Sequence, residues 1–188
     1  MNHKVEIEVS ARHVHLSKED YGFLFGSGAP FEEKKELSQR GEYATDKLVR
    51  LVGPKGEVKA RFLSPFRSKT QAEISLTDCY QIGIKPNFQS NAYEGGEKIL
   101  IIGSAGEIKR ESAIVSKRHL HVNTKEAQEL DLNDGQKVKV ISKTKRGRTE
   151  FDDIVVKIAD SYQLRLHLDT DEGNAAGIIS KEFGELIV

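Results

Sequence analysis

The 188-residue sequence contains one cysteine, Cys79, no tryptophan and only four prolines. A single cysteine excludes an internal disulfide framework and any cysteine-rich zinc site, and we expect Cys79 to be a small buried residue. No apolar run approaches the roughly 20 residues that a membrane-spanning helix needs. The first residues, MNHKVEIEVS, lack the apolar segment of a signal peptide. The sequence therefore predicts a cytoplasmic protein with no membrane partner.

Charge of one sign is not in excess either. The 29 lysines and arginines balance 29 aspartates and glutamates, so the formal net charge is zero. Nucleic-acid binding needs a basic bias, and no nucleic-acid partner is expected. Glycine-rich phosphate loops of the P-loop or dinucleotide type are also missing. The length allows one large domain or two small ones, each with a core.

Histidine, in contrast, is concentrated in one repeated phrase. Four of the six histidines lie in two copies of Arg-His-x-His, Arg12–His15 and Arg118–His121. On a strand, residues i and i+2 share a face and stand roughly 6.6 Å apart, so two imidazoles can bind one metal ion. On a helix they would point in nearly opposite directions, and the flanking valines and leucines favour a strand. Each histidine could instead pack singly, but the repetition favours metal binding, and His167 could complete one site.

Other polar residues could contribute chemistry. Residues 70–75 alternate as a strand with Gln71, Glu73 and Ser75 on one face. Glu73 could be an oxygen ligand of zinc, and Arg67 could bind a phosphate or carboxylate through two hydrogen bonds. The alternative is a solvated strand face beside a loop arginine. The acidic run at residues 169–172, just after His167, could orient that histidine or hold a proton. The alternatives are a charged turn or the carboxylates at the start of a helix.

The two halves of the chain repeat one order of elements at an offset of 106 residues. Each has a strand, the histidine phrase, a capped helix and further strands. The caps are Ser17-x-x-Asp20 and Asn123-x-x-Glu126. An internal duplication rich in short strands predicts a mainly β fold of two small β-barrels with short capping helices.

Four longer motifs carry a resemblance to a known family. They read SARHVHLS, FRSKTQAEISLTD, IVSKRHLHV and LHLDTDEGNAA, and they run in this order between residue 5 and about residue 177. In these motifs the chain closely resembles the phosphate propanoyltransferases, or phosphotransacylases, of the propanediol-utilisation type (the PduL family). The resemblance implies the reversible reaction of acyl-CoA and phosphate to acyl phosphate and CoA, with a short acyl group, at a two-zinc site. It also implies a homodimer and two interleaved barrels, one of residues 1–11 plus 118–188 and one of residues 12–117.

The resemblance also assigns roles to single residues. It implies that His13, His15 and Glu73 hold one zinc ion, which the CoA sulfur can join. It implies that His119, His121 and His167 hold the second, with water or phosphate at the open positions. Arg67 matches the arginine that binds phosphate, and Gln39 and Gln71 match glutamines of the site. Here Ser38-Gln39-Arg40-Gly41-Glu42 replaces the usual Q-P-G-Q, so the resemblance gives Glu42 no role.

The resemblance bears on localisation as well. Family members destined for microcompartments carry an N-terminal extension, whereas the first predicted strand here begins almost at Met1. We therefore expect a cytoplasmic enzyme that is not encapsulated. Two other functions fit the same ligands, namely a two-zinc hydrolase acting on a thioester and a structural zinc-binding β-barrel module.

Overall fold

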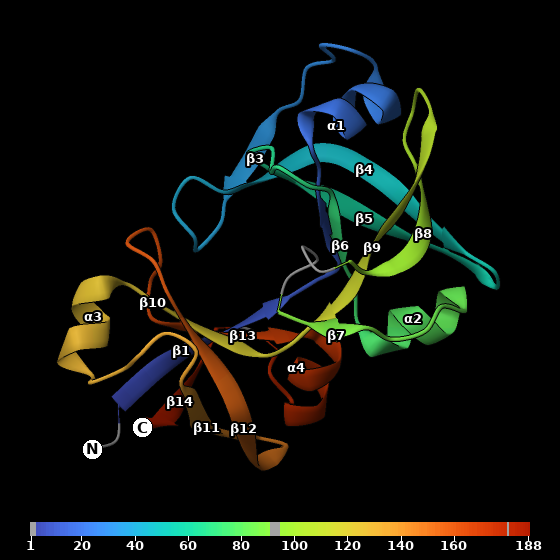
Figure 1. Cartoon of the computed structure of the whole chain (residues 1–188). Coiled ribbons are helices and arrows are strands. Elements are labelled where there is room, and N and C mark those ends of the chain that lie inside the picture. The colour runs from blue at the N-terminus through green and yellow to red at the C-terminus, as the bar shows by residue number, and fades with distance from the viewer. Residues whose placement is uncertain (1–2, 91–94, 180) are drawn as a thin grey trace. The chain divides into compact units, whose positions relative to one another are not determined.

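The fold is mainly β with short helices, as the sequence predicts, in a computed structural model that describes residues 3–90, 95–179 and 181–188 (Figure 1). The chain divides into two compact units. One consists of Met1–Ser10 with Lys117–Val188, and the other of Ala11–Ser116. We call them the terminal unit and the middle unit. Among the described residues, no helix is long and apolar enough to cross a membrane.

Six strands of the middle unit form a closed ring, as far as the structure describes that unit, with each strand hydrogen-bonded to the next. Alternate side chains point into the ring, so that Val14, Phe62 and Ala72 are buried in one apolar core. Two short strands, β3 (Glu33–Glu36) and β7 (Phe88–Gln89), attach to this ring. The ring runs β2 (His13–His15), β6 (Gln71–Glu73), β9 (Glu107–Ser116), β8 (Glu97–Ile102), β4 (Tyr43–Gly53), β5 (Gly56–Ser64) and back to β2.

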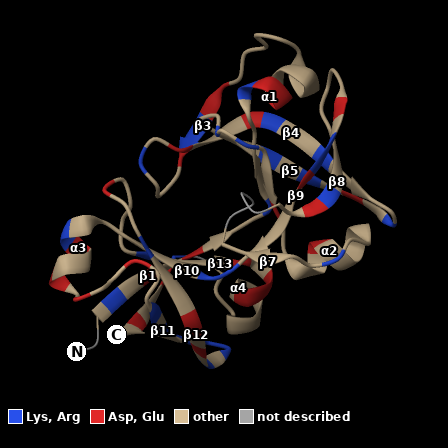
Figure 2. Cartoon of the chain, viewed as in Figure 1, with Lys and Arg blue, Asp and Glu red and all other residues tan. Residues whose placement is uncertain are grey.

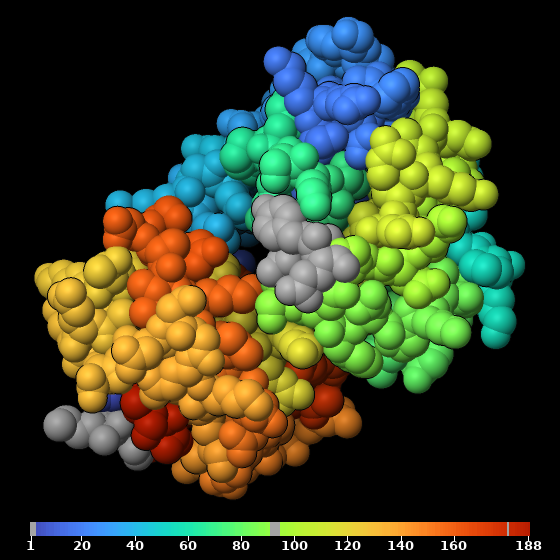
Figure 3. Space-filling view, viewed as in Figure 1, coloured from blue at the N-terminus to red at the C-terminus, as the bar shows by residue number. Residues whose placement is uncertain are grey.

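Helix α1 (Lys18–Phe25) begins where the sequence predicts, because the Ser17 side chain accepts the N–H of Asp20. The helix packs closely on the turn between β8 and β9, and their atoms lie against one another in Figure 3. The Ala105 N–H donates to the Leu24 carbonyl at 2.9 Å. A Cβ added to Gly103 would stand 2.2 Å from the same carbonyl oxygen. Glycine is therefore required at this contact.

Helix α2 (Leu76–Ile82) departs from the sequence prediction. Residues 70–75 were expected to form one strand, but β6 ends at Glu73. Ser75 instead caps the helix and exchanges two hydrogen bonds with Asp78. The alternation of polar and apolar residues continued past the end of the strand, so the capping pair was the better indicator. Cys79 is buried in this helix, as expected.

The terminal unit repeats the ring. Leu120, Leu166 and Leu168 point into its core, and two helices, α3 (Thr124–Glu129) and α4 (Thr170–Ala176), accompany the strands in the part that the structure describes. Asn123 caps α3 with Glu126, as predicted. The ring runs β1 (His3–Ser10), β13 (Arg165–Asp169), β10 (His119–Val122), β12 (Gly147–Ile158), β11 (Lys137–Thr144), β14 (Glu182–Ile187) and back to β1.

The chain interleaves the two barrels. Strand β1 leads directly into β2 of the middle unit, yet it pairs with β13 and β14 of the terminal unit. Strand β9 likewise leads into β10 but pairs with β6 and β8. Each histidine strand thus follows a strand of the other barrel, which confirms the expected interleaved pair. Basic and acidic residues are interspersed along the ribbon of each unit (Figure 2).

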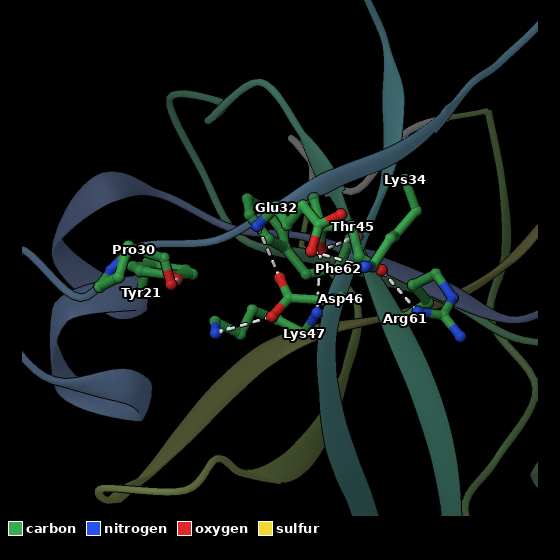
Figure 4. Close-up of polar contacts among 9 residues, drawn as sticks. All are labelled: Tyr21, Pro30, Glu32, Lys34, Thr45, Asp46, Lys47, Arg61 and Phe62. Atoms are coloured by element: carbon green, nitrogen blue, oxygen red, sulfur yellow. Dashed lines mark hydrogen bonds and ion pairs between the residues drawn. The ribbon is translucent and has the colours of Figure 1, made fainter.

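A polar network holds the segment that enters β4 (Figure 4). The buried Thr45 hydroxyl donates to the Phe62 carbonyl at 2.8 Å. The Glu32 N–H donates to the Asp46 carboxylate at 2.8 Å. The Thr45 bond holds β4 on β5 where their pairing register shifts, and the Asp46 bond ties β4 to the segment before β3. The turn at residues 37–42, which precedes β4, is anchored by a hydrogen bond of its own, from the Leu37 N–H to the Glu42 carbonyl at 2.8 Å.

Candidate metal centres

The middle unit brings His13, His15 and Glu73 together. In the antiparallel pairing of β2 with β6, His13 stands opposite Glu73. Val14, between the two histidines, points into the core, so both imidazoles lie on the outer face of the barrel. The Glu73 Oε1 atom lies 3.6 Å from His13 Nε2 and 4.0 Å from His15 Nε2. The three donor atoms lie within 4.8 Å of one another, close enough for one metal ion.

The surroundings of the first cluster act differently on its two imidazoles. The Nδ1 atom of His13 lies 2.9 Å from the Ala11 carbonyl oxygen. Because a carbonyl only accepts, Nδ1 carries the proton and Nε2 faces the cluster. Burial lowers the pKa of His15 well below its ordinary value, and the charges of His13 and Arg67 lower it further. Burial is the largest single influence on the pKa of His13 and acts to lower it, but the Glu73 carboxylate and the Ala11 carbonyl together raise this pKa.

The terminal unit brings His119, His121 and His167 together in the same way. His119 stands opposite His167 in the antiparallel pairing of β10 with β13. The ring centres lie 4.3 to 5.2 Å apart, and the three donor atoms again lie within 4.8 Å of one another. The Nδ1 atom of His119 lies 2.8 Å from the Lys117 carbonyl oxygen. This second cluster therefore also presents Nε2 of its first histidine.

Arg67 lies beside the first cluster. Its positive charge acts on both His13 and His15. Its backbone N–H donates to the Leu16 carbonyl at 2.9 Å, one residue beyond the histidine strand. Its Nη2 atom lies 3.0 Å from Glu42 Oε1, in an ion pair that is largely but not fully shielded from solvent. An arginine is thus held next to three ligand-type side chains.

The two glutamines take different positions. The Gln71 side chain donates from Nε2 to Glu73 Oε1, so it touches the first cluster directly. Gln39 lies in the anchored turn at residues 37–42, where its backbone carbonyl accepts the N–H of Glu42 at 3.1 Å. Through its backbone, Gln39 therefore holds the residue that pairs with Arg67.

The donor sets fit zinc. Imidazole nitrogen and carboxylate oxygen are among its usual ligands. Each cluster supplies three such ligands, and sites with three protein ligands leave a position for water or substrate. The first set carries one carboxylate and the second is made of imidazoles alone. The two sites therefore differ in charge.

The sequence did not point to Tyr162. Its ring stacks on His121 with centres 3.8 Å apart and planes at 17°. Tyr162 lies in the turn between β12 and β13, and no local pattern marks it.

The sequence leaves open whether the acidic run at residues 169–172 acts on His167 or forms a turn or the start of a helix. The structure shows a helix start, because Asp169 caps α4 and Glu172 completes the capping box.

Comparison with known proteins bears on the chemistry. A family model described as phosphate propanoyltransferase matches residues 6–179, a range that includes both clusters. Curated relatives carry the same description. One from Thermotoga maritima is 43% identical over 173 residues, which cover 90% of this chain and 82% of the relative. Another, from Leptotrichia buccalis, is 41% identical over 183 residues, which cover 96% and 86%. A third, from Clostridioides difficile, is 42% identical over 176 residues, which cover 92% and 84%.

Proposed function

Because the chain belongs to the phosphate propanoyltransferase family, it is an acyltransferase, and we propose that it converts acyl-CoA and phosphate to acyl phosphate and CoA with two zinc ions. Propanoyl and acetyl are the proposed acyl groups. In this reaction a phosphate oxygen bonds to the acyl carbon, the carbon–sulfur bond breaks, and CoA leaves as the thiolate. The reverse reaction regenerates the thioester.

One observation carries the proposal beyond the family name. Arg67 lies beside a cluster of His13, His15 and Glu73, so an anion-binding group and a three-ligand set occur together. Arginine presents a planar fork that matches phosphate oxygens, and its charge persists at any working pH. A hydrolase acting on the same thioester would need no such group.

The side chains of the clusters have separable roles in this proposal. Zinc ions bound by the first cluster and by His119, His121 and His167 would supply positive charge for the CoA sulfur and the phosphate. Backbone carbonyls hold the first histidine of each cluster in the tautomer that presents Nε2. Gln71 orients the Glu73 carboxylate by donating to it. Arg67 binds phosphate and lowers the entropic barrier of its attack on the thioester.

Phosphate dependence tests the proposed reaction. Acetyl-CoA, propanoyl-CoA and butanoyl-CoA are each assayed for free thiol, with phosphate and in phosphate-free buffer. Acyl phosphate is trapped with hydroxylamine in the same samples. We expect thiol release only with phosphate and one acyl phosphate for each thiol. Equal thiol release without phosphate would identify a hydrolase. If the zinc-bound protein releases no thiol under either condition, the remaining explanation is a structural zinc-binding module.

Metal content tests the zinc part separately. We expect about two zinc ions per chain, one for each three-residue cluster. His15→Ala and His121→Ala should each remove one, whereas His3→Ala, outside both clusters, should keep two. One ion or none in the unaltered protein would contradict the two-zinc site. A homodimer is also part of the proposal, and the mass in solution tests it.

A further inference from the structure

The arginine that precedes the first histidine of each cluster makes the same long-range contact. In the middle unit, Arg12 meets Asp78 at two points. Nε lies 3.0 Å from Oδ2 and Nη2 lies 2.8 Å from Oδ1. In the terminal unit, Arg118 Nε lies 2.8 Å from Glu172 Oε1. Both carboxylates stand at the third position of the helix that follows the strand carrying the third ligand. The duplication has therefore kept an arginine–carboxylate pair beside each cluster.

The equivalence extends over the whole connection from ligand to helix end. In each unit the third ligand is followed by a helix cap, a carboxylate that completes the capping box, and a glycine with positive φ that ends the helix. Corresponding residues differ by the same 94 positions throughout, in the pairs Glu73 and His167, Ser75 and Asp169, Asp78 and Glu172, and Gly83 and Gly177. One element with one geometry thus accompanies both metal clusters, although the third ligand differs.

The contact joins the two strands that supply the ligands. Strands β2 and β6 have only three residues each, so few ladder hydrogen bonds fix their spacing. Arg12 reaches from the start of β2 to the helix that begins beyond the end of β6. Asp78 is 1% exposed and also accepts the Ser75 N–H at 3.1 Å. The carboxylate of this pair is buried, whereas the Arg12 side chain is 40% exposed. A two-point contact with a fixed carboxylate is directional, so it restricts where the two strand ends can lie.

We propose that Arg12 and Arg118 are positioning residues, each fixing the two histidines of one strand relative to the third ligand on its neighbour and so setting the zinc affinity of its own cluster. The inference rests on the metal sites of the proposed function. It adds a role for two residues that are not themselves members of either cluster. Because each arginine acts within its own unit, the two effects should be separable.

The test measures zinc affinity one cluster at a time. The His121→Ala background leaves only the first cluster complete, and His15→Ala leaves only the second. Affinity for Zn²⁺ is measured by competition with a chelator. We expect Arg12→Gln to weaken zinc binding about 10- to 100-fold in the His121→Ala background, as changes to groups that orient ligands do. Arg118→Gln should do the same in the His15→Ala background. In the crossed combinations, Arg12→Gln is placed in the His15→Ala background and Arg118→Gln in the His121→Ala background. Their zinc affinity should stay within about twofold of that of the background variant alone.

Matched controls separate positioning from general stability. Arg50→Gln and Arg148→Gln each break an exposed arginine–glutamate pair in the same units and should leave zinc affinity unchanged. Thermal midpoints are measured with and without zinc, since binding stabilises the folded state according to affinity. Arg12→Lys keeps the charge without the fork. Compared with Arg12→Gln, this variant should regain more of the lost thermal stability of the metal-free protein than of the lost zinc affinity.

Several outcomes would overturn the inference. If Arg12→Gln and Arg118→Gln lower the midpoints equally with and without zinc, the pairs only stabilise the fold. If the crossed combinations lose as much affinity as the direct ones, the effect is not local. Should Arg12→Gln fail to fold, Asp78→Asn provides the same test with the shape retained. Absence of zinc from the unaltered protein would instead refute the metal sites themselves, which keeps the two failures distinct.

Discussion

The guanidinium of Arg67 is paired with a carboxylate, since its Nη2 atom lies 3.0 Å from Glu42 Oε1. The pair spans 25 residues of chain and joins the anchored turn at residues 37–42 to the first cluster. A carboxylate on the arginine that should receive phosphate is an internal competitor for that anion. Phosphate must displace Glu42 or share the arginine with it.

Removing the competitor should therefore strengthen phosphate binding. We expect Glu42→Gln to lower the Michaelis constant for phosphate by up to about fivefold, since partly exposed ion pairs contribute about 0.2–1 kcal/mol. The constant for acyl-CoA should change little. Initial rates over a range of phosphate concentrations measure the effect, and Glu36→Gln on the exposed strand β3 is the control. A higher phosphate constant would mean that Glu42 helps to bind phosphate.

Arg67→Lys should weaken phosphate use far more than use of CoA. Lysine keeps the charge but lacks the planar fork that holds two phosphate oxygens. We expect the phosphate Michaelis constant to rise about tenfold or more, with a smaller change for acyl-CoA. Arg50→Lys, in an exposed pair of the same unit, is the matched control. If Arg67→Lys and Arg67→Ala both leave the phosphate constant unchanged, Arg67 does not contact phosphate.

Glu73→Gln should remove the charged ligand of the first cluster while keeping its shape. The site would then hold zinc less tightly, and turnover of propanoyl-CoA should fall by well over ~10-fold. Inhibition by the product CoA should weaken too, since the thiolate loses its metal. Zinc is counted in the same samples, with Glu57→Gln on β5 as the control. Full activity with two zinc ions retained would return Glu73 to the role of a surface carboxylate.

The charge of Glu73 should also be detectable in the zinc-free protein. It raises the pKa of His13 above 6.5, the value for an unperturbed histidine, against the opposing effect of burial. The folded chain then holds this proton more tightly than the unfolded chain. His13 therefore stabilises the metal-free fold below about pH 6.5, and the contribution is lost as the pH rises through the raised pKa. Imidazole NMR signals report that pKa, and Glu73→Gln should lower it. An unchanged pKa would show that Glu73 does not act on His13.

Tyr162 should support the second cluster through its ring. Stacked aromatic pairs contribute about 0.5–1.5 kcal/mol, so Tyr162→Ala should weaken zinc binding there about 2- to 10-fold. Tyr162→Phe keeps the ring and should retain the affinity. Both variants are measured in the His15→Ala background, with the exposed Tyr80→Ala as the control. Equal losses for Phe and Ala would assign the effect to the hydroxyl instead.

The sequence predicted what depends on local pattern. The repeated His-x-His phrase identified both histidine strands, and Ser17 and Asn123 gave the starts of α1 and α3. The sequence analysis did not predict helix α2, although Ser75-x-x-Asp78 is a capping pattern. The alternation of polar and apolar residues over 70–75 was interpreted as strand as far as Ser75. The zinc-ligand assignments came from the family resemblance and stay predictions. The geometry adds that the donor atoms of each set lie together.

Contacts between distant residues could not be predicted. The pairing of Arg67 with Glu42 and the stacking of Tyr162 on His121 depend on how strands align across a closed barrel. No periodicity in a single segment encodes that alignment. The equivalence of Arg12 and Arg118 was visible in the repeated phrase. Their carboxylate partners were not, because Asp78 and Glu172 are far from these arginines in the sequence.

The interleaving of the two barrels also determines the order in which they can close during synthesis at the ribosome. Residues 11–116 are continuous in the chain, so the middle barrel can close while synthesis proceeds. Strand β1 is synthesised before the middle unit, whereas its partners β13 and β14 are synthesised after it. At roughly 5–20 residues per second, β1 waits on the order of ten seconds with both edges unpaired. During synthesis, β1 is therefore open to pairing with a wrong strand or another chain.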